Sequence, residues 1–432
     1  MGFRKIDVTE IPGFRLGNAE DLEAGTGCTA IICENGAVAG VDVRGGGPAT
    51  RETDLLRSEN SVQTINCVML SGGSAFGLEA GSGAMRFLEK KGAGFRMGDI
   101  CVPIVCQASL YDLDVASSQV RPDREMGEKA CENAYSGIFS DGNHGAGTGA
   151  TVGKYCGMER AMKSGLGTFA CSNGVVHVGA VAAVNAIGDV YNGNGRLIAG
   201  ILSPDGTQIS GSINYLKNAI LKDDAPEEEP AGMEKETSQQ VHAGTAAEAV
   251  QESVPEATQE TTAASGSADE DIRGTATEDT TESATDHRDE AAQEEVTDAD
   301  ACSEVTQETE EPAEEIVYDH RLELSSDDLG EDVTFNTTIS CLITNAKLTK
   351  SQANKLASTL HDGYARSIKP VHGSLDGDTI FVMTTGEVDV NFDAFAALAT
   401  DTLQYSVINA VTSAEDAYGF PSARTMAMRM QK

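Results

Sequence analysis

Asn336-Thr337-Thr338-Ile339-Ser340-Cys341-Leu342-Ile343-Thr344 combines β-branched and apolar residues, and this composition predicts a buried strand that begins at Thr337. Downstream, Thr349-Lys350-Ser351-Gln352 is a capping box, which marks the start of a helix with an apolar face. Asp376-Gly377-Asp378 then predicts a turn into a second strand over residues 379–385. The alternation of strands and helices in this half indicates an α/β protein.

The N-terminal half contains two Asn-Gly pairs that lie between or before apolar runs, and such pairs signal β-hairpins. Glu34-Asn35-Gly36 predicts a hairpin between strands at residues 29–33 and 37–43. Ser172-Asn173-Gly174 predicts a turn into a long strand-like run over residues 175–190. Antiparallel pairing is therefore expected in this half of the chain.

Three further helix signals complete the pattern. Apolar residues at helical spacing over residues 78–88 predict a helix that ends at Gly92, which suits the C-terminal cap. Pro122 suits the first position of a second helix. A last helix is expected through Phe395, Leu398 and Leu403.

An acidic stretch divides the chain. Residues 223–315 contain 30 Asp or Glu against 3 Lys or Arg, so they carry −27 of the net charge of −37. The stretch contains no aromatic residue and few branched aliphatic ones, and it cannot bury enough apolar area to offset the entropy of ordering. We therefore expect four parts: residues 1–222, a disordered acidic insert at 223–316, a short segment at 317–336, and residues 337–432.

Composition excludes several classes of function. A nucleic-acid binder needs clustered Lys and Arg, and no such patch or membrane-spanning run occurs in the sequence. The ten cysteines lie scattered, mostly in apolar runs, which is typical of buried thiols in a reduced cytoplasmic protein. Gly153-Lys154 lacks the rest of a P-loop, and neither the cysteines nor the histidines have metal-ligand spacing. We expect no cofactor and no metal.

A hydrolase without a visible Ser-His pair can use an N-terminal nucleophile, whose own α-amine acts as the base. An internal threonine becomes N-terminal when its hydroxyl attacks the preceding carbonyl and the resulting ester is hydrolysed. Thr337 satisfies the requirement because it opens a strand after a flexible segment, but Thr338 is an equal candidate on these grounds. A strand start with no chemistry is the alternative.

Longer motifs resemble one family. They are 336–339 (Asn-Thr-Thr-Ile), 348–353, 376–381, 70–78, 147–154 (Gly-Thr-Gly-Ala-Thr-Val-Gly-Lys) and 184–190 (Val-Asn-Ala-Ile-Gly-Asp-Val). Together they are similar to the P1 family of self-processing hydrolases, also classed as S58, which includes aminopeptidase-esterases, β-peptidyl aminopeptidases and nylon-oligomer endo-hydrolases. In these motifs the endo-hydrolases are the most similar. The resemblance covers nearly everything except the acidic insert.

The resemblance implies that the chain cleaves itself between Asn336 and Thr337 and that Thr337 is the hydrolytic nucleophile. The residues that match the family's catalytic partners are Tyr111, Lys154, Asn185, Asp376 and Asp378. The i, i+2 spacing of the two aspartates would place both carboxylates on one face of an extended segment, where one could hold Thr337 and the other orient it. Asn185 and Tyr111 could donate to an oxyanion, and Lys154 could place the scissile carbonyl.

The family also implies an α-β-β-α sandwich and a homo-tetramer of processed heterodimers. Expected substrates are short peptides or linear ω-amino-acid amides. One alternative function is acyl transfer of the ornithine acetyltransferase type, although those enzymes process within an Ala-Thr-Met-Leu context that residues 336–339 do not match. The other alternative is a scaffold that keeps the fold without turnover.

Overall fold

A computed structural model describes residues 2–213, 215–217 and 336–430 of the chain. The acidic stretch 223–315 and most of the segment before Asn336 lie outside these residues. Within them, strand β15 (Thr337–Ala346) pairs antiparallel with β12 (His177–Asn185) on one side and parallel with β17 (Thr379–Val388) on the other. The predicted buried strand that begins at Thr337 is thereby confirmed.

The described residues form a ten-stranded sheet around this trio. Its spatial order is β1 (Arg4–Ile6), β11 (Leu166–Ser172), β12, β15, β17, β3 (Thr26–Val43), β5 (Thr64–Ser71), β8 (Val105–Ser109) and β4 (Ala49–Arg51), and β2 (Arg15–Asp21) pairs with β3. The long strand β3 pairs with β17 through its C-terminal half and with β2 through its N-terminal half. It therefore joins two halves of one sheet, which fold over each other.

Side chains alternate between the two faces of each strand, and this alternation separates three hydrophobic cores. Ile339 and Ile343 of β15 face an inner core shared with β3, β5 and β8, whereas Leu342 faces the opposite side. Because successive side chains of a strand point to opposite faces, each strand supplies two layers at once. The expected α-β-β-α sandwich is confirmed, with the inner core between the two halves of the sheet.

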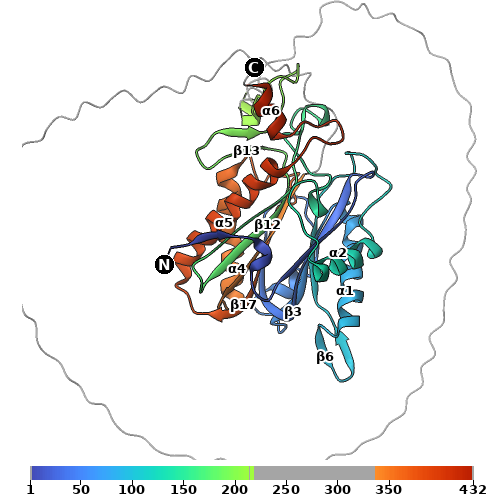
Figure 1. Cartoon of the computed structure of the whole chain (residues 1–432), viewed down its shortest axis with the longest axis vertical. Coiled ribbons are helices and arrows are strands. Elements are labelled where there is room, and N and C mark those ends of the chain that lie inside the picture. Colours follow the sequence, from blue (N-terminus) through green and yellow to red (C-terminus); the bar gives the residue numbers. More distant parts are fainter. Residues whose placement is uncertain (1, 214, 218–335, 431–432) are drawn as a thin grey trace, which may run out of the picture. The chain divides into compact units, whose positions relative to one another are not determined.

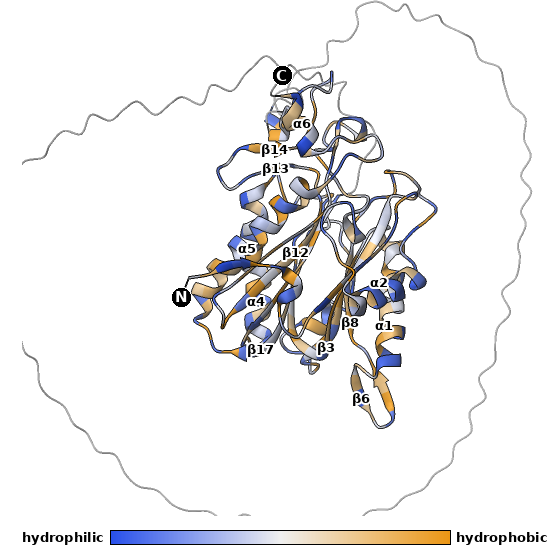
Figure 2. Cartoon of the chain, in the orientation of Figure 1, coloured by the Kyte–Doolittle hydropathy of each residue, from blue (hydrophilic) through white to orange (hydrophobic). Residues whose placement is uncertain are grey.

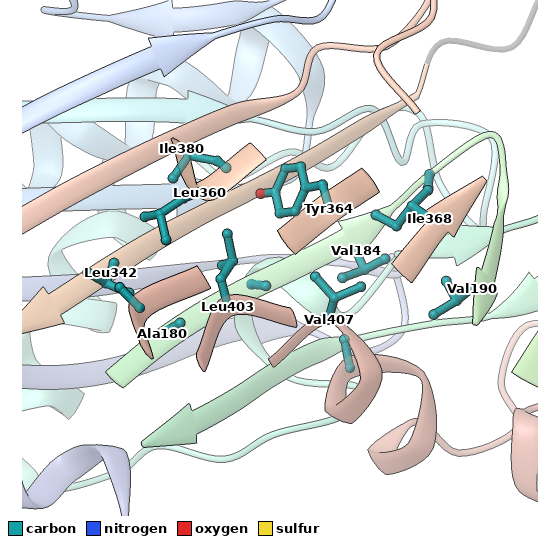
Figure 3. Close-up of a cluster of buried hydrophobic side chains, with 14 of the residues drawn as sticks. Ala180, Val184, Val190, Leu342, Leu360, Tyr364, Ile368, Ile380, Leu403 and Val407 are labelled. Atoms are coloured by element: carbon teal, nitrogen blue, oxygen red, sulfur yellow. The ribbon is translucent and has the colours of Figure 1, made fainter. Parts of the chain in front are cut away.

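Helices cover both outer faces (Figure 1). They are α1 (Ala80–Lys91) and α2 (Arg124–Ser136) on one face, α4 (Lys350–Ser367) and α5 (Phe392–Ser413) on the other, and the short α6 (Ala423–Arg429) near the C-terminus. Figure 2 shows a mixture of hydrophilic and hydrophobic residues on these helices, as expected for helices with one face in solvent. Figure 3 shows side chains of α4 and α5 packed against side chains of the sheet; the helices contribute Leu360, Tyr364, Leu403 and Val407, and the strands contribute Val184, Leu342 and Ile380.

Shorter elements complete the described chain. They are β13 (Asp189–Tyr191), β14 (Leu197–Ala199) and β16 (Ile368–Lys369) in one small sheet, the pairs β9 (Thr151–Val152) with β10 (Met162–Lys163) and β6 (Phe95–Met97) with β7 (Ile100–Val102), and 3-10 helices at Val8–Glu10, Asp54–Leu56, Ser74–Glu79, Gly145–Gly147 and Met158–Arg160. No helix in the described part of the chain is long and apolar enough to cross a membrane. The nine cysteines among these residues are all free thiols.

Two predictions of local structure are wrong. Asn35-Gly36 does not turn the chain, because β3 continues through it and the register against β5 shifts there. Gly36 has φ 86° at this irregularity, so the Asn-Gly pair supplies the left-handed residue of a β-bulge rather than a hairpin turn. Pro122 precedes α2, whose N-cap is Asp123, with its side chain accepting from the Met126 N–H.

Other local predictions are confirmed. Gly174, at φ 89°, lies in the connection between β11 and β12, which are paired antiparallel. Gly92 caps α1 in the left-handed conformation, and Thr349 and Gln352 form the predicted capping box of α4. These features depend only on residues close in sequence, which is why sequence alone predicts them.

The first residue of α4 anchors a distant loop. Lys350 Nζ donates to the carbonyls of Leu55, Asn60 and Val62, each at 2.9 Å, and the residue is 6% exposed. Replacing Lys350 with Met removes three charge-assisted hydrogen bonds, and we expect the free energy of unfolding to fall by about 2 kcal/mol.

Urea denaturation measures this change. Lys347→Met is the matched control, since the Lys347 side chain is 63% exposed and pairs with the exposed Asp389. The control should lose less than about 0.5 kcal/mol. Equal losses in the two variants would contradict the anchoring role of Lys350.

Candidate active site

The Asn336–Thr337 peptide lies where β15, a central strand of the large sheet, begins. Asn336 forms an isolated parallel bridge with Asp376, and both residues are buried. The Asn336 N–H donates to the Leu375 carbonyl at 3.0 Å, and the Gly377 N–H donates to the Asn336 carbonyl at 2.8 Å. The segment before β17 thus continues the parallel ladder past the start of β15 and holds this peptide in place.

The Thr337 hydroxyl lies against the carbonyl that precedes it. Thr337 Oγ1 donates to the Asn336 carbonyl oxygen, which also accepts from Gly377. A Cβ atom at position 377 would lie 2.6 Å from Thr337 Oγ1, so glycine is required for this close approach. The Thr337 hydroxyl therefore lies beside the carbonyl group that precedes it, and a backbone N–H donates to the oxygen of that carbonyl, as in an oxyanion hole.

Asp376 and Asp378 flank Gly377 and are buried beside each other. Asp378 Oδ1 accepts from the backbone N–H of Thr338 at 2.7 Å, and Asp376 Oδ2 accepts from the Gly373 N–H at 2.7 Å. Burial and the charge of Asp378 raise the pKa of Asp376 to about 7. Among the described residues, neither carboxylate is hydrogen-bonded to the Thr337 hydroxyl, and Asp378 instead holds the backbone that follows it.

Asn185 is the register partner of Thr337 on β12. Its Oδ1 accepts from Lys154 Nζ at 2.8 Å and from the Thr151 N–H at 3.0 Å, while its Nδ2 donates to the Tyr111 carbonyl at 2.6 Å. Lys154 Nζ also donates to the Asn185 carbonyl at 3.0 Å. The structure thus brings Lys154, Asn185 and Thr337 together from three separate parts of the chain.

Lys154 is buried, and no carboxylate of the described residues is in hydrogen-bond contact with its Nζ. Burial lowers its pKa to about 7, although Asp376 and, more weakly, Asp114 and Asp112 oppose the shift. The side chain is therefore near the balance between its charged and neutral forms at neutral pH. A lysine in this state can serve as a hydrogen-bond donor or take part in proton transfer.

Tyr111 reaches the group through its backbone rather than through its phenol. Its carbonyl accepts from Asn185, and its hydroxyl donates to Asp114 Oδ1 at 3.0 Å. Tyr111 lies close to Asp112, Asp114, Val115, Thr151, Lys154 and Met158. The Tyr111 phenol is thus hydrogen-bonded to Asp114, and its backbone carbonyl makes the contact with Asn185.

Two groups at the site have no signal in the sequence. The Gly377 N–H is a backbone donor, and only the register of the ladder places it on the Asn336 carbonyl. His372 Nδ1 lies 2.8 Å from Asp378 Oδ2, within a loop whose path the sequence does not predict. In the described part of the chain, no three His, Cys, Asp or Glu side chains are grouped so that they could hold a metal ion.

Comparisons with known proteins place the chain in a family. The profile of peptidase family S58 matches residues 7–425. An uncharacterized aminopeptidase of Mycobacterium tuberculosis (strain ATCC 25618 / H37Rv) is 28% identical over 444 residues, which cover 97% of each protein. A 6-aminohexanoate-oligomer endohydrolase of Agromyces sp. (strain KY5R) is 25% identical over 415 residues, which cover 93% of this chain and 84% of that protein.

A solved structure shows the same fold. The L-aminopeptidase D-Ala-esterase/amidase from Ochrobactrum anthropi, described as a new variant of the Ntn hydrolase fold, superimposes with a TM-score of 0.54 at 15% identity. The match covers 98% of this chain and 92% of that one, so it includes both sides of Thr337. With the family match over residues 7–425, it follows that the chain belongs to peptidase family S58 and is a peptide- or amide-bond hydrolase.

Proposed function

We propose that the protein cleaves itself between Asn336 and Thr337 and then uses the freed Thr337 as its nucleophile. The observation that carries this proposal is the contact of Thr337 Oγ1 with the Asn336 carbonyl, on which the Gly377 N–H also donates. Thr338, the equal candidate by sequence, holds Asp378 through its backbone N–H instead. This difference favours Thr337.

Self-cleavage follows from these contacts. Thr337 Oγ1 attacks the Asn336 carbonyl carbon, and the Gly377 N–H stabilises the negative oxygen that develops. The carbon–nitrogen bond breaks, which leaves an ester between Asn336 and the Thr337 side chain and frees the Thr337 α-amine. Water then hydrolyses the ester, so that Asn336 ends as a carboxylate and Thr337 as an N-terminus.

Turnover of a substrate repeats this chemistry on another amide. The Thr337 α-amine, whose ordinary pKa is about 7.7–8.0, accepts the hydroxyl proton as Oγ1 attacks and passes it to the leaving amine. Asn185 has a second amide hydrogen beyond the one given to Tyr111, and it can offer this hydrogen to the oxyanion. Lys154 orients Asn185 through Oδ1, and water releases the acid.

The substrates that fit are short peptides with a free amino end or linear ω-amino-acid amides. The support lies in the relatives, which include an aminopeptidase and an oligomer endohydrolase of 6-aminohexanoate. We also propose a cytoplasmic homo-tetramer of processed heterodimers, with residues 223–316 as a solubilising insert. The free thiols are consistent with a reducing compartment, and light scattering of the purified protein will measure the assembly.

Self-cleavage predicts two fragments on a denaturing gel, residues 1–336 and 337–432. Thr337→Ala removes the attacking hydroxyl, so this variant should remain one chain and lose amidase activity by on the order of 10⁴-fold or more. Thr338→Ala is the matched control, because the backbone N–H that holds Asp378 remains, and it should still cleave. An uncut wild-type protein would point to the scaffold alternative.

Hydrolysis also predicts that amine release from aminoacyl amides proceeds without an added acceptor. The amine and the free acid should appear in equal amounts, because water takes the acyl group. Mass spectrometry of the products with and without a second amine measures this directly. Dependence of turnover on the acceptor would favour acyl transfer instead.

Asp376 predicts a pH-dependent stability difference. Its pKa is raised from 3.8 to about 7 in the folded protein, so the folded state binds more protons than the unfolded state in this window. The stability linked to this proton is present below pH 3.8 and is lost as pH rises towards 7. The free energy of unfolding of Asp376→Asn, relative to wild type, should therefore increase from pH 4 to pH 7 and then level off. The same variant should have no activity, because Asp376 belongs to the proposed site.

Urea denaturation across this pH range measures the difference. Asp389→Asn is the control, because the Asp389 side chain is 89% exposed and its replacement should leave a small and constant difference. A relative stability of Asp376→Asn that stays flat or decreases with pH would refute the assigned environment of Asp376.

A further inference from the structure

His372 grips the carboxylate of Asp378 with two donors. Its ring Nδ1 lies 2.8 Å from Asp378 Oδ2, and its backbone N–H donates to the same oxygen at 3.1 Å. The Asp378 oxygen accepts from the backbone N–H of His372, and a carboxylate oxygen can accept from the ring Nδ1–H as well. The Asp378 side chain is 1% exposed and the His372 side chain 19%, so water competes little for this pair.

The other oxygen of the same carboxylate reaches the nucleophile's strand. Asp378 Oδ1 accepts from the backbone N–H of Thr338, the residue that follows Thr337, at 2.7 Å. Asp378 thus links the loop that contains His372 to the first residues of β15. Any rotation of the carboxylate about its own axis would break one of these contacts, and His372 prevents that rotation.

Neighbouring rings fix the orientation of the His372 imidazole. The ring of His361 lies edge-on at 4.6 Å between centroids, and the ring of Tyr364 lies at 6.2 Å. Both come from α4, whose Tyr364 hydroxyl donates to Ser340 Oγ on β15 at 2.7 Å. Burial and the neighbouring His372 lower the pKa of His361 to about 4. The His361 ring is therefore neutral at neutral pH and does not repel a positive charge on its neighbours.

The backbone of His372 adopts a conformation that disfavours most side chains. Its φ is 61°, one of four positive values at residues other than glycine in the described chain. Such a conformation is unfavourable for a residue other than glycine and persists where the surroundings require it, often at functional sites. Here it lets the backbone N–H and the ring Nδ1 reach the same carboxylate oxygen.

We propose that His372 is a positioning residue for the nucleophile. It holds Asp378 in the orientation that fixes the Thr338 N–H, and through that bond it keeps Thr337 Oγ1 on the line of attack. This inference rests on the proposed role of Thr337. It assigns His372 no contact with substrate, so its loss should impair the chemical step and leave substrate binding nearly unchanged.

Two substitutions of His372 separate the effect of losing the side-chain donor from the effect of changing the backbone conformation. Asn tolerates a positive φ and places its Nδ2 donor where the Nδ1 of histidine lies, so His372→Asn keeps the grip on Asp378. Glycine also tolerates a positive φ but has no side-chain donor, so His372→Gly loses it without adding backbone strain. Should the glycine variant fail to fold, His372→Gln replaces it, since its longer side chain carries the amide past the Nδ1 position.

The rate of self-cleavage, kcat and KM are measured on the full chain, with thermal unfolding as the check of folding. We expect His372→Gly to cleave slowly and to lose on the order of 100-fold in kcat, with KM within about threefold of wild type. His372→Asn should recover most of the loss. His144→Gly is the control, because His144 forms a similar pair with Glu20, at 2.9 Å, away from these contacts.

Different results would contradict the positioning role of His372 and the proposed role of Thr337. Wild-type kcat and cleavage in His372→Gly, or equal impairment of the folded Asn and Gly or Gln variants, would overturn the positioning role while leaving Thr337 as the nucleophile. A rise in KM without a fall in kcat would also overturn it. A wild-type chain that stays uncut, or a Thr337→Ala variant that still cleaves, would instead refute the proposed function itself.

Discussion

The active-site geometry depends on the pairing of β15 between β12 and β17. The antiparallel register with β12 sets Asn185 opposite Thr337, and the parallel ladder with β17 continues to the bridge between Asn336 and Asp376. One peptide bond is therefore held from both sides by backbone hydrogen bonds. A shift of one residue in either register would turn every β15 side chain to the other face and remove Thr337 from its partners.

The sandwich makes this register costly to change. Ile339 and Ile343 pack in the inner core while Leu342 packs against α4 and α5, so the strand is buried on both faces. A slip would bring Ser340 and Thr338 into the inner core in their place and leave their hydroxyls without suitable partners. The same packing that stabilises the domain thus determines where Thr337 lies.

Several ionisable side chains are buried beside the start of β15. Lys154, Asp376 and Asp378 lie within one water-poor region, and burial shifts the pKa of Lys154 and that of Asp376 to about 7. Because burial raises the pKa of Asp376, its ionisation destabilises the fold, and buried groups with such shifted pKa values are frequent at functional sites. Tyr364 and His361 of α4, packed beside it, connect the outer helical layer to the site.

Sequence by itself determined the features that depend on neighbouring residues. These are the strand that begins at Thr337, the capping box at Thr349, the cap at Gly92, the Asn173-Gly174 turn and the family of the chain. Asn35-Gly36 shows the limit of such signals, because the same dipeptide serves a hairpin turn or a bulge and only the partner strand decides which.

Tertiary structure alone decided which groups meet. Asn185 faces Thr337, Gly377 donates to the Asn336 carbonyl, and His372 grips Asp378 because long-range pairing and a left-handed loop residue bring them together. It also directed the Tyr111 phenol to Asp114 and shifted the pKa of Lys154 by removing it from water. Register and desolvation arise from residues far apart in the chain, so no local pattern records them.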